Sequence, residues 1–156
     1  LYHETLFGSS AVAQNAAAPL MRFVSAALVG TPDNNALAAD AHKAKVAVLV
    51  GHDSNIASLL AAMKTAEYEL PKQYEKTPIS GKIVFQRWHD KNDNRDLMKI
   101  EYVYQSTDQI RNATPLSLSS PAQRVVLQID GCKIDANGFC PMDDFKTAIA
   151  KDIQGE

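Results

Sequence analysis

The residue types best suited to chemistry in this sequence form one short run, Gly51-His52-Asp53-Ser54-Asn55. The run follows an apolar segment typical of a strand and precedes a segment with helical periodicity, which places it at a helix N-terminus. Backbone N–H groups lack intrahelical partners there, and the helix dipole favours an anion. A histidine next to a carboxylate adds a cationic donor and a proton donor, the groups that phosphate-ester cleavage requires.

Two other interpretations apply to the same run. Asp and Ser are preferred helix N-caps, so Asp53 or Ser54 would only cap the helix and His52 would be an ordinary loop histidine. Ser54 as the nucleophile of a hydrolase elbow is disfavoured, because the G-x-S-x-G pattern needs a glycine two residues to either side. The nearest glycine lies three residues before Ser54, and the residue two positions after it is Ile56.

No metal or cofactor site is predicted from the sequence. The other histidines lie in predicted loops or near a chain end, without a second ligand at metal-binding spacing. They are His3, His42 and His89. The run Asp135-Ala136-Asn137-Gly138 resembles the start of a calcium loop but lacks the closing Glu, so we predict a tight turn.

The sequence holds two cysteines, Cys132 and Cys140. The turn signal Asn137-Gly138 between them would bring the two sulfur atoms within disulfide reach. A disulfide across so short a loop favours an oxidising compartment. The alternative is a pair of unpaired, buried thiols in a cytosolic protein.

Composition narrows the class of protein. The 156 residues, 46% hydrophobic and 22% charged, suit one compact domain. A formal net charge of −2 leaves no polybasic face for a nucleic-acid partner. Because no uninterrupted run of apolar residues has the length of a membrane span, we expect no membrane partner.

The predicted elements alternate between helix and strand. Residues 9–29 form an apolar stripe at helical spacing, with Ser9 or Ser10 as N-cap, Gly30 as terminator and a kink or break at Pro19. Residues 31–45 are predicted to be a polar loop and an insertion. The apolar run 46–50 is predicted to be a central strand buried on both faces, as in a parallel sheet, and 54–63 the following helix.

The second half of the chain is predicted to hold strands and two further helical segments. Strands are expected at 82–88, 97–104 and 124–129, with a long solvated hairpin loop at 89–96. A short helical turn is expected at 106–112 and a closing helix at 142–153.

Several separate blocks resemble the histidine acid phosphatases. The run 48–57 is similar to the second signature of that family, a strand followed by a His-Asp turn. The similarity continues through residues 77–88, 98–106 and 138–142, and extends from about Thr5 to about Ile149. Within the family, the blocks resemble the bacterial periplasmic glucose-1-phosphatases more closely than the phytases.

The resemblance implies an α/β fold, part of a three-layer sandwich in which helices flank a central sheet. It implies an acid phosphomonoesterase of sugar phosphates, such as glucose 1-phosphate, that works through a phosphohistidine intermediate and needs no metal or cofactor. His52 is then expected to contact the phosphate and Asp53 to protonate the leaving alcohol, with Ser54 and Asn55 at the phosphate-binding helix N-terminus. In the glucose-1-phosphatase branch the acid can come partly from elsewhere. Cys132 and Cys140 match a disulfide of this periplasmic family.

One part of the family pattern is missing from this sequence. The first signature, Arg-His-Gly-x-Arg-x-Pro, which supplies the nucleophile, does not occur. Because the chain also begins at Leu1, we interpret residues 1–156 as the C-terminal part of such an enzyme, without most of the helical cap. The expected partners are a small phosphomonoester and the N-terminal part of the same enzyme.

Three consequences follow for the chain itself. Alone, it is predicted to be inactive. Some apolar surface of 46–50 and of the 9–29 helix should be exposed or covered by a partner. The alternatives are a non-catalytic module that binds phosphate or sugar phosphate, and a phytase-type phosphatase of the same family.

Overall fold

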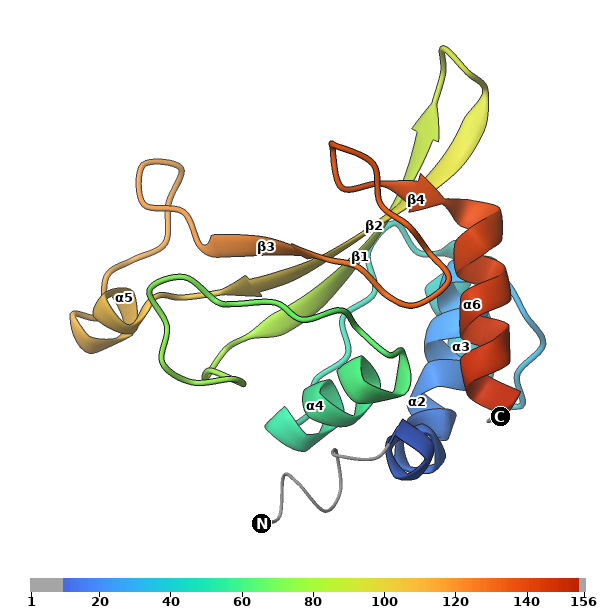
Figure 1. The fold of residues 1–156 in the computed structure, drawn as a ribbon, viewed down its shortest axis with the longest axis horizontal. Helices are drawn as coiled ribbons and strands as arrows, with labels where there is room; N and C mark the ends of the chain where they lie inside the picture. The colour runs from blue at the N-terminus through green and yellow to red at the C-terminus, as the bar shows by residue number, and fades with distance from the viewer. Residues whose placement is uncertain (1–9, 155–156) are drawn as a thin grey trace.

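The computed structural model describes residues 10–154, which fold into helices packed against an antiparallel sheet (Figure 1). The helices are α2 (Ser10–Val29), α3 (Ala36–Lys43), α4 (Asp53–Ala62), α5 (Thr107–Arg111) and α6 (Met142–Gln154). The strands are β1 (Lys82–Asp90), β2 (Arg95–Tyr104), β3 (Gln123–Leu127) and β4 (Cys140–Pro141). The α/β class predicted from the sequence is therefore confirmed.

The sheet is built around β2, which pairs with β1, β3 and β4. Each pairing is antiparallel, with Phe85 opposite Ile100 and Tyr102 opposite Val125. The predicted strands at 82–88, 97–104 and 124–129 are confirmed within a few residues. The predicted loop 89–96 is wrong in part, because β1 and β2 continue into it and leave only residues 91–94 for the turn. Cross-strand polar pairs such as His89 with Asp96 extend the hairpin.

One face of the sheet forms the core with α6 and with the segment 66–81. Phe85 lies against Phe145 of α6, with ring centroids 6.2 Å apart. Tyr102 and Tyr104 are fully buried and donate hydrogen bonds to the backbone of segment 66–81, at Lys76 O and Pro71 O. Burial raises the pKa of the Tyr102 hydroxyl.

The long helix α2 is a core helix. The buried side holds small and flexible residues spaced at helical intervals, Ala13, Ala17, Met21 and Val24. By length and composition the segment Ala11–Val29 would also suffice to cross a membrane, but its inward side packs against α4, α3 and α6. The helix continues through Pro19 without a break and ends at Val29, and the following Gly30 has a φ of +79°. Ser9, a predicted N-cap, lies outside the described residues.

The prediction of a loop at 31–45 is wrong, because α3 occupies its second half. Asn35 caps this helix by accepting the Leu37 N–H at 3.0 Å. The helix is rich in alanine, the strongest helix former, and it buries Ala38. His42 Nδ1 lies 2.9 Å from Ala27 O of α2, which ties the two helices together.

The run 46–50 is neither a paired strand nor buried, so the predicted central strand of a parallel sheet is wrong for this chain. It forms an irregular segment between α3 and α4. The side chain of Val48 is 81% exposed and that of Val50 is 95% exposed. A strand buried on both faces needs neighbours on both edges and a layer on each side, and the described residues supply none of these to this run. The expectation that its apolar surface is exposed is confirmed.

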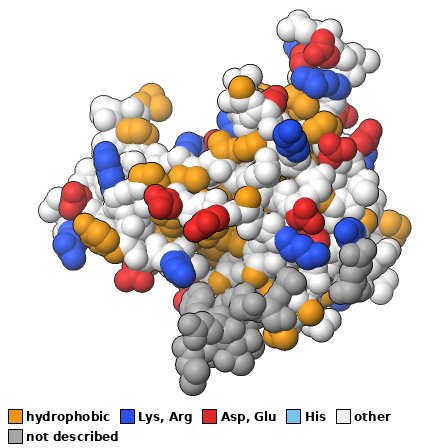
Figure 2. All heavy atoms as spheres, in the orientation of Figure 1, with side chains coloured by type: hydrophobic (Ala, Val, Ile, Leu, Met, Phe, Trp, Pro, Cys, Tyr) orange, Lys and Arg blue, Asp and Glu red, His pale blue; other side chains and the backbone are white. Residues whose placement is uncertain are grey.

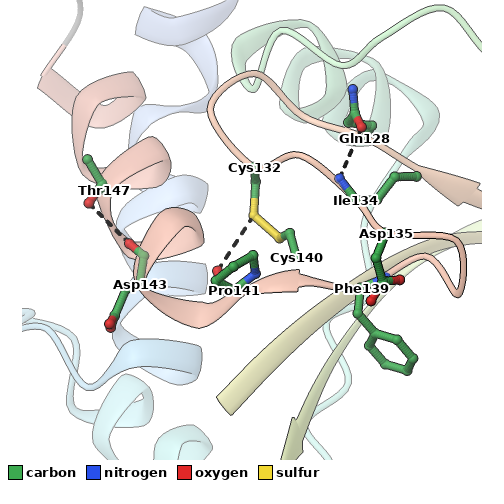
Figure 3. Close-up of a disulfide and its surroundings, with 9 residues drawn as sticks. All are labelled: Gln128, Cys132, Ile134, Asp135, Phe139, Cys140, Pro141, Asp143 and Thr147. Carbon is green, nitrogen blue, oxygen red and sulfur yellow. Dashed lines mark hydrogen bonds between the residues drawn. A yellow bond between two sulfur atoms is a disulfide. The ribbon is translucent and has the colours of Figure 1, made fainter. Parts of the chain in front are cut away.

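The two cysteines form a disulfide that closes the loop between β3 and α6 (Figure 3). Both are buried, with Cα atoms 5.6 Å apart. Within the loop, the Asp135 carboxylate accepts the N–H groups of Asn137 and Phe139, and Gly138 N–H donates to Asp135 O. The predicted tight turn is confirmed, and the alternative of two free thiols is wrong.

Candidate active site

Helix α4, which carries the predicted site, is held firmly at its C-terminal half. Leu59 and Leu60 are buried in the core, and α4 packs along α2. Past the helix end, Ala66 N–H donates to Gln128 O at 2.8 Å and Asp130 N–H donates to Met63 O. The N-terminal end of α4 therefore projects from a rigid base, which is what a binding site on a helix end requires.

His52 is the N-cap residue of α4. Its backbone is extended, with a φ of −113° and a ψ of 168°, and its carbonyl accepts the N–H of Asn55 at 3.0 Å. The His52 N–H in turn donates to Asn55 Oδ1 at 2.8 Å. A Cβ on Gly51 would lie 2.8 Å from Asn55 Oδ1, so a larger residue at this position would have to displace the Asn55 side chain. The local hydrogen bonds thus fix the backbone of His52 and leave its ring exposed.

Asp53 and Ser54 form the first turn. Asp53 Oδ1 accepts the Ser54 N–H at 2.8 Å, and Asp53 is exposed. The N–H groups of Ser54 and Asn55 are therefore already engaged within the turn. A phosphoryl oxygen would have to displace the Asp53 carboxylate to reach the Ser54 N–H, and that displacement would free the carboxylate for proton transfer.

The four predicted site residues lie together but are not enclosed. His52, Asp53 and Asn55 are exposed and Ser54 is half-buried. Two shallow, open hollows among the described residues lie elsewhere, one along α6 and the other beside Gly131. Figure 2 shows positive and negative side chains interspersed on the face it presents. Within residues 10–154, no ion pair involves Asp53.

The other sequence candidates lie away from this turn. His89 pairs with Asp96 on the β1–β2 hairpin at 2.8 Å, and His42 lies against α2. His3 is outside the described residues. Among the described side chains, no group of three or more His, Cys, Asp or Glu is placed to hold a metal ion.

One polar cluster was not anticipated from the sequence. Glu101 on β2 is only 7% exposed and accepts hydrogen bonds from Gln86 at 2.7 Å and Arg124 at 2.8 Å. Lys99 lies 3.8 Å from its other oxygen. These residues come from three neighbouring strands, so only the register of the sheet brings them together.

Comparison with known proteins identifies the family. A sequence profile of the histidine phosphatase superfamily (branch 2) matches residues 5–105, which include the His52-Asp53 turn. This chain belongs to the histidine phosphatase superfamily. The resemblance inferred from the residue blocks is therefore confirmed at the family level.

Individual members of the superfamily show the same relationship. A glucose-1-phosphatase of Salmonella typhimurium is 59% identical over 149 residues, which is 95% of this chain and 34% of that protein. A glucose-1-phosphatase of Providencia rettgeri is 44% identical over 153 residues, covering 98% of this chain and 35% of that protein. The apo structure of a Hafnia alvei phytase superposes with a TM-score of 0.86 at 28% identity, over 96% of this chain and 37% of the phytase.

The chain thus spans about a third of the length of the curated relatives it matches. The histidine phosphatase fold of these proteins includes a large part with no counterpart in this chain. The exposed His52-Asp53 turn and the exposed run 46–50 lie in the portion of the chain matched to the superfamily.

Proposed function

We propose that this chain supplies the His-Asp half of the active site of an acid phosphomonoesterase that hydrolyses sugar phosphates such as glucose 1-phosphate. The observation that carries the proposal is the His52-Asp53 pair, held at the N-terminus of the anchored helix α4. The identity to two glucose-1-phosphatases supports this substrate class over the inositol phosphates of phytases.

The chemistry assigns a separate task to each residue. A histidine outside this chain attacks phosphorus, forming a P–N bond while the ester P–O bond breaks. His52 donates to a phosphoryl oxygen and stabilises the charge that develops there. Asp53 gives its proton to the departing alkoxide. In the second step Asp53 takes a proton from water, whose oxygen attacks phosphorus as the P–N bond breaks.

The turn geometry places the Asp53 carboxylate where a phosphoryl group would bind. Unliganded, Asp53 Oδ1 accepts the Ser54 N–H at 2.8 Å. A bound phosphoryl group competes for the same positive helix end and would release the carboxylate from that bond. This exchange frees the Ser54 N–H for the phosphoryl group, while Asn55, whose N–H donates to the His52 carbonyl, holds the turn in place.

The proposal includes a partner and a compartment. The nucleophile and the basic residues that clamp the phosphate are assigned to the N-terminal part of the same enzyme, and no cofactor is required. The buried Cys132–Cys140 disulfide fits an oxidising compartment, and we place the protein in the periplasm.

A chimeric enzyme provides the test. In it, the matching segment of the Salmonella typhimurium glucose-1-phosphatase is replaced by this chain. The chimera should hydrolyse glucose 1-phosphate, and His52→Ala should lower kcat/KM by about 100-fold or more, the usual loss for an oxyanion contact. His89→Ala, on the hairpin, is the control and should retain activity. Near-normal turnover by His52→Ala would overturn the assignment.

Asp53 is tested through the leaving group. Asp53→Asn should slow hydrolysis of glucose 1-phosphate far more than that of p-nitrophenyl phosphate, because nitrophenolate leaves without needing a proton. An equal loss with both substrates would show that Asp53 is not the acid. A chimera that binds phosphate or tungstate but hydrolyses neither ester would favour the non-catalytic binding module.

A further inference from the structure

The cystine loop, residues 133–139 between the two cysteines, has at its tip an exposed turn with the sequence Asn137-Gly138. The two arms of the loop lie side by side, because the Asp135 N–H donates to Phe139 O at 2.8 Å (Figure 3). Asparagine followed by glycine is the pair in which spontaneous deamidation is fastest. In that pair no side chain hinders attack of the glycine backbone nitrogen on the asparagine side chain. The turn therefore holds a reactive pair of residues that the proposed function does not use.

The fold requires glycine at position 138. Gly138 has a φ of +84°, in the left-handed region. A Cβ at this position would also lie 2.8 Å from Val126 Cγ1 and 3.3 Å from Lys99 Cε on the sheet. Asn137, by contrast, is exposed and is not among the described non-glycine residues with a positive φ. The fold thus fixes the residue that supplies the attacking nitrogen, while position 137 is open to other side chains.

Asp135 restrains this nitrogen in the closed turn. Its carbonyl oxygen accepts the Gly138 N–H at 3.0 Å, and its carboxylate accepts the N–H groups of Asn137 at 2.8 Å and Phe139 at 3.0 Å. These hydrogen bonds hold the pKa of the Asp135 carboxyl below 3.8, so the carboxylate is ionised at neutral pH and the bonds are charge-assisted. The Gly138 nitrogen must lose its proton and turn toward the Asn137 side chain to react, and both movements break the closed turn.

We propose that Asn137 is a self-modification site, which deamidates to aspartate and isoaspartate when the turn centred on Asp135 opens. The Gly138 backbone nitrogen loses its proton and attacks Asn137 Cγ, forming a C–N bond while the side-chain amide leaves as ammonia. Water then opens the resulting succinimide ring. Cleavage of the new C–N bond gives aspartate, and cleavage of the original peptide bond gives isoaspartate. The reaction needs only water, and it is independent of the phosphatase assignment.

The isoaspartate product would keep the turn from closing again. It adds one methylene to the main chain between residues 137 and 138, so the hydrogen bonds to Asp135 fall out of register. Phe139 is held on the sheet by the same turn, with its ring centroid 5.6 Å from that of Trp88 and 5.0 Å from Lys99 Nζ. Release of the turn would free Phe139 from both contacts. Deamidation would thus leave a lasting chemical record that the loop had opened.

Two other exposed asparagines supply an internal comparison. Asn92 and Asn94 lie in the β1–β2 turn and are followed by Asp93 and Arg95. The side chain of each following residue hinders attack by its backbone nitrogen. Exposure alone would modify all three asparagines, whereas the Asn-Gly chemistry singles out Asn137.

Peptide mapping by mass spectrometry tests the proposal after incubation of the folded chain at mildly alkaline pH. Asp135→Ala should raise the rate of deamidation at position 137 by about 10-fold or more, because the turn loses its charge-assisted bonds and opens more often. Asp135→Asn retains an oxygen acceptor without the charge and should give an intermediate rate. Asn137→Ser should abolish the modification and leave the melting temperature unchanged. Equal rates in wild type and Asp135→Ala, or faster reaction at Asn92 or Asn94, would overturn the proposal.

Wild type in urea gives a reference that does not depend on whether a variant folds. The unfolded chain sets the upper rate, and folded wild type should react at least about 10-fold more slowly. The double variant Cys132→Ala, Cys140→Ala should lie between them, because its loop is no longer closed covalently. Deamidation of folded wild type at the unfolded rate would contradict any restraint by Asp135.

Trp88 reports the consequence, since it is the single tryptophan of the sequence. The isoaspartate form, separated from unmodified protein by ion exchange, should show altered Trp88 fluorescence because Phe139 has left the indole ring. Asn137→Asp, which adds the charge without lengthening the main chain, is the matched control and should keep the wild-type spectrum. Identical spectra for the isoaspartate form and wild type would contradict release of the loop.

Discussion

Asn55 holds the candidate site through its own side chain. Its Oδ1 accepts the His52 N–H at 2.8 Å, and its backbone N–H donates to the His52 carbonyl. Asn55→Ala should therefore lower the free energy of unfolding by about 1 kcal/mol, the usual cost of a lost helix cap. Asn55→Asp keeps the acceptor and should restore most of that stability.

Urea denaturation of the chain measures this effect. Asn92→Ala is the control, because Asn92 lies in the exposed hairpin turn and, within residues 10–154, only its backbone N–H is hydrogen-bonded, to Asp90 Oδ1. Equal midpoints for Asn55→Ala and Asn92→Ala would show that the Asn55 cap contributes nothing.

Asp135 is expected to make stability depend on acid pH. Its carboxylate accepts the N–H groups of Phe139 and Asn137, and these hydrogen bonds hold its pKa below the ordinary value of 3.8. The bond from Phe139 has the larger effect. A folded-state pKa below the unfolded one stabilises the protein above pH 3.8, and this contribution is lost as the pH falls through the folded pKa. Asp135→Asn should therefore reduce the loss of stability on acidification.

The test is to measure denaturation midpoints of wild type and Asp135→Asn between about pH 6 and pH 2.5. This range brackets the ordinary carboxyl pKa. Asp143→Asn serves as the control, since that side chain is 95% exposed and makes only a 3.9 Å contact with Lys146. An acid dependence unchanged in Asp135→Asn would contradict a stabilising role for the Asp135 carboxylate.

The sequence predicts which residues gather at the turn but not how they bond. His52, Asp53, Ser54 and Asn55 are adjacent in the chain, so their co-location needs no tertiary information. Whether the Ser54 N–H donates to the Asp53 carboxylate or to a ligand depends on the Asp53 rotamer, which the sequence does not specify. The Glu101 cluster was missed for a different reason, because its members are far apart in sequence and meet only through strand register.

At the scale of elements, the disulfide is the main covalent constraint on the loop that leads into α6. It joins residues eight apart, and the chain-entropy estimate for so short a loop is about 2–3 kcal/mol. The double variant Cys132→Ala, Cys140→Ala should be destabilised by about that amount. Thermal unfolding measures this loss of stability. The disulfide is first reduced with dithiothreitol in the unfolded chain, and an unreduced sample serves as the reference. Wild type should lose stability on reduction, whereas the double variant should not respond, and equal stability of the two proteins would contradict the estimate.

Two elements show where local sequence and tertiary context disagree. The local sequence is sufficient to predict α3, because Asn35 followed by an alanine-rich run is a typical helix start. The polar residues around this run led to the incorrect prediction of a loop. Local signals for 46–50 indicate a buried strand, yet the run is exposed, because burial depends on neighbours that the described residues do not provide. The hairpin of β1 and β2 was predictable because adjacent strands pair locally.

At the scale of the whole molecule, the chain combines a buried core with a candidate site that is open to solvent. Phe145, Tyr102 and Met98 are fully buried, so the sheet and α6 have a core of their own. The His52-Asp53 turn, by contrast, is open to solvent. Preorganised charge is effective only where water is excluded and the reacting groups are fixed. Under the proposed function, the attacking histidine lies outside this chain, which contains no Arg-His-Gly sequence.

The isolated chain should therefore hydrolyse p-nitrophenyl phosphate no faster than its own His52→Ala variant, because loss of a nucleophile leaves little for the remaining groups to stabilise. Steady-state assays on the purified chain, with the chimera as the positive control, measure this. Saturable hydrolysis that disappears in His52→Ala would mean that His52 or a neighbour attacks phosphorus itself. Saturable hydrolysis that persists in His52→Ala would place a second nucleophile elsewhere in the chain. Either result would show that a third of the relatives' length is sufficient for catalysis, and the division of labour proposed for the two parts of the enzyme would be wrong.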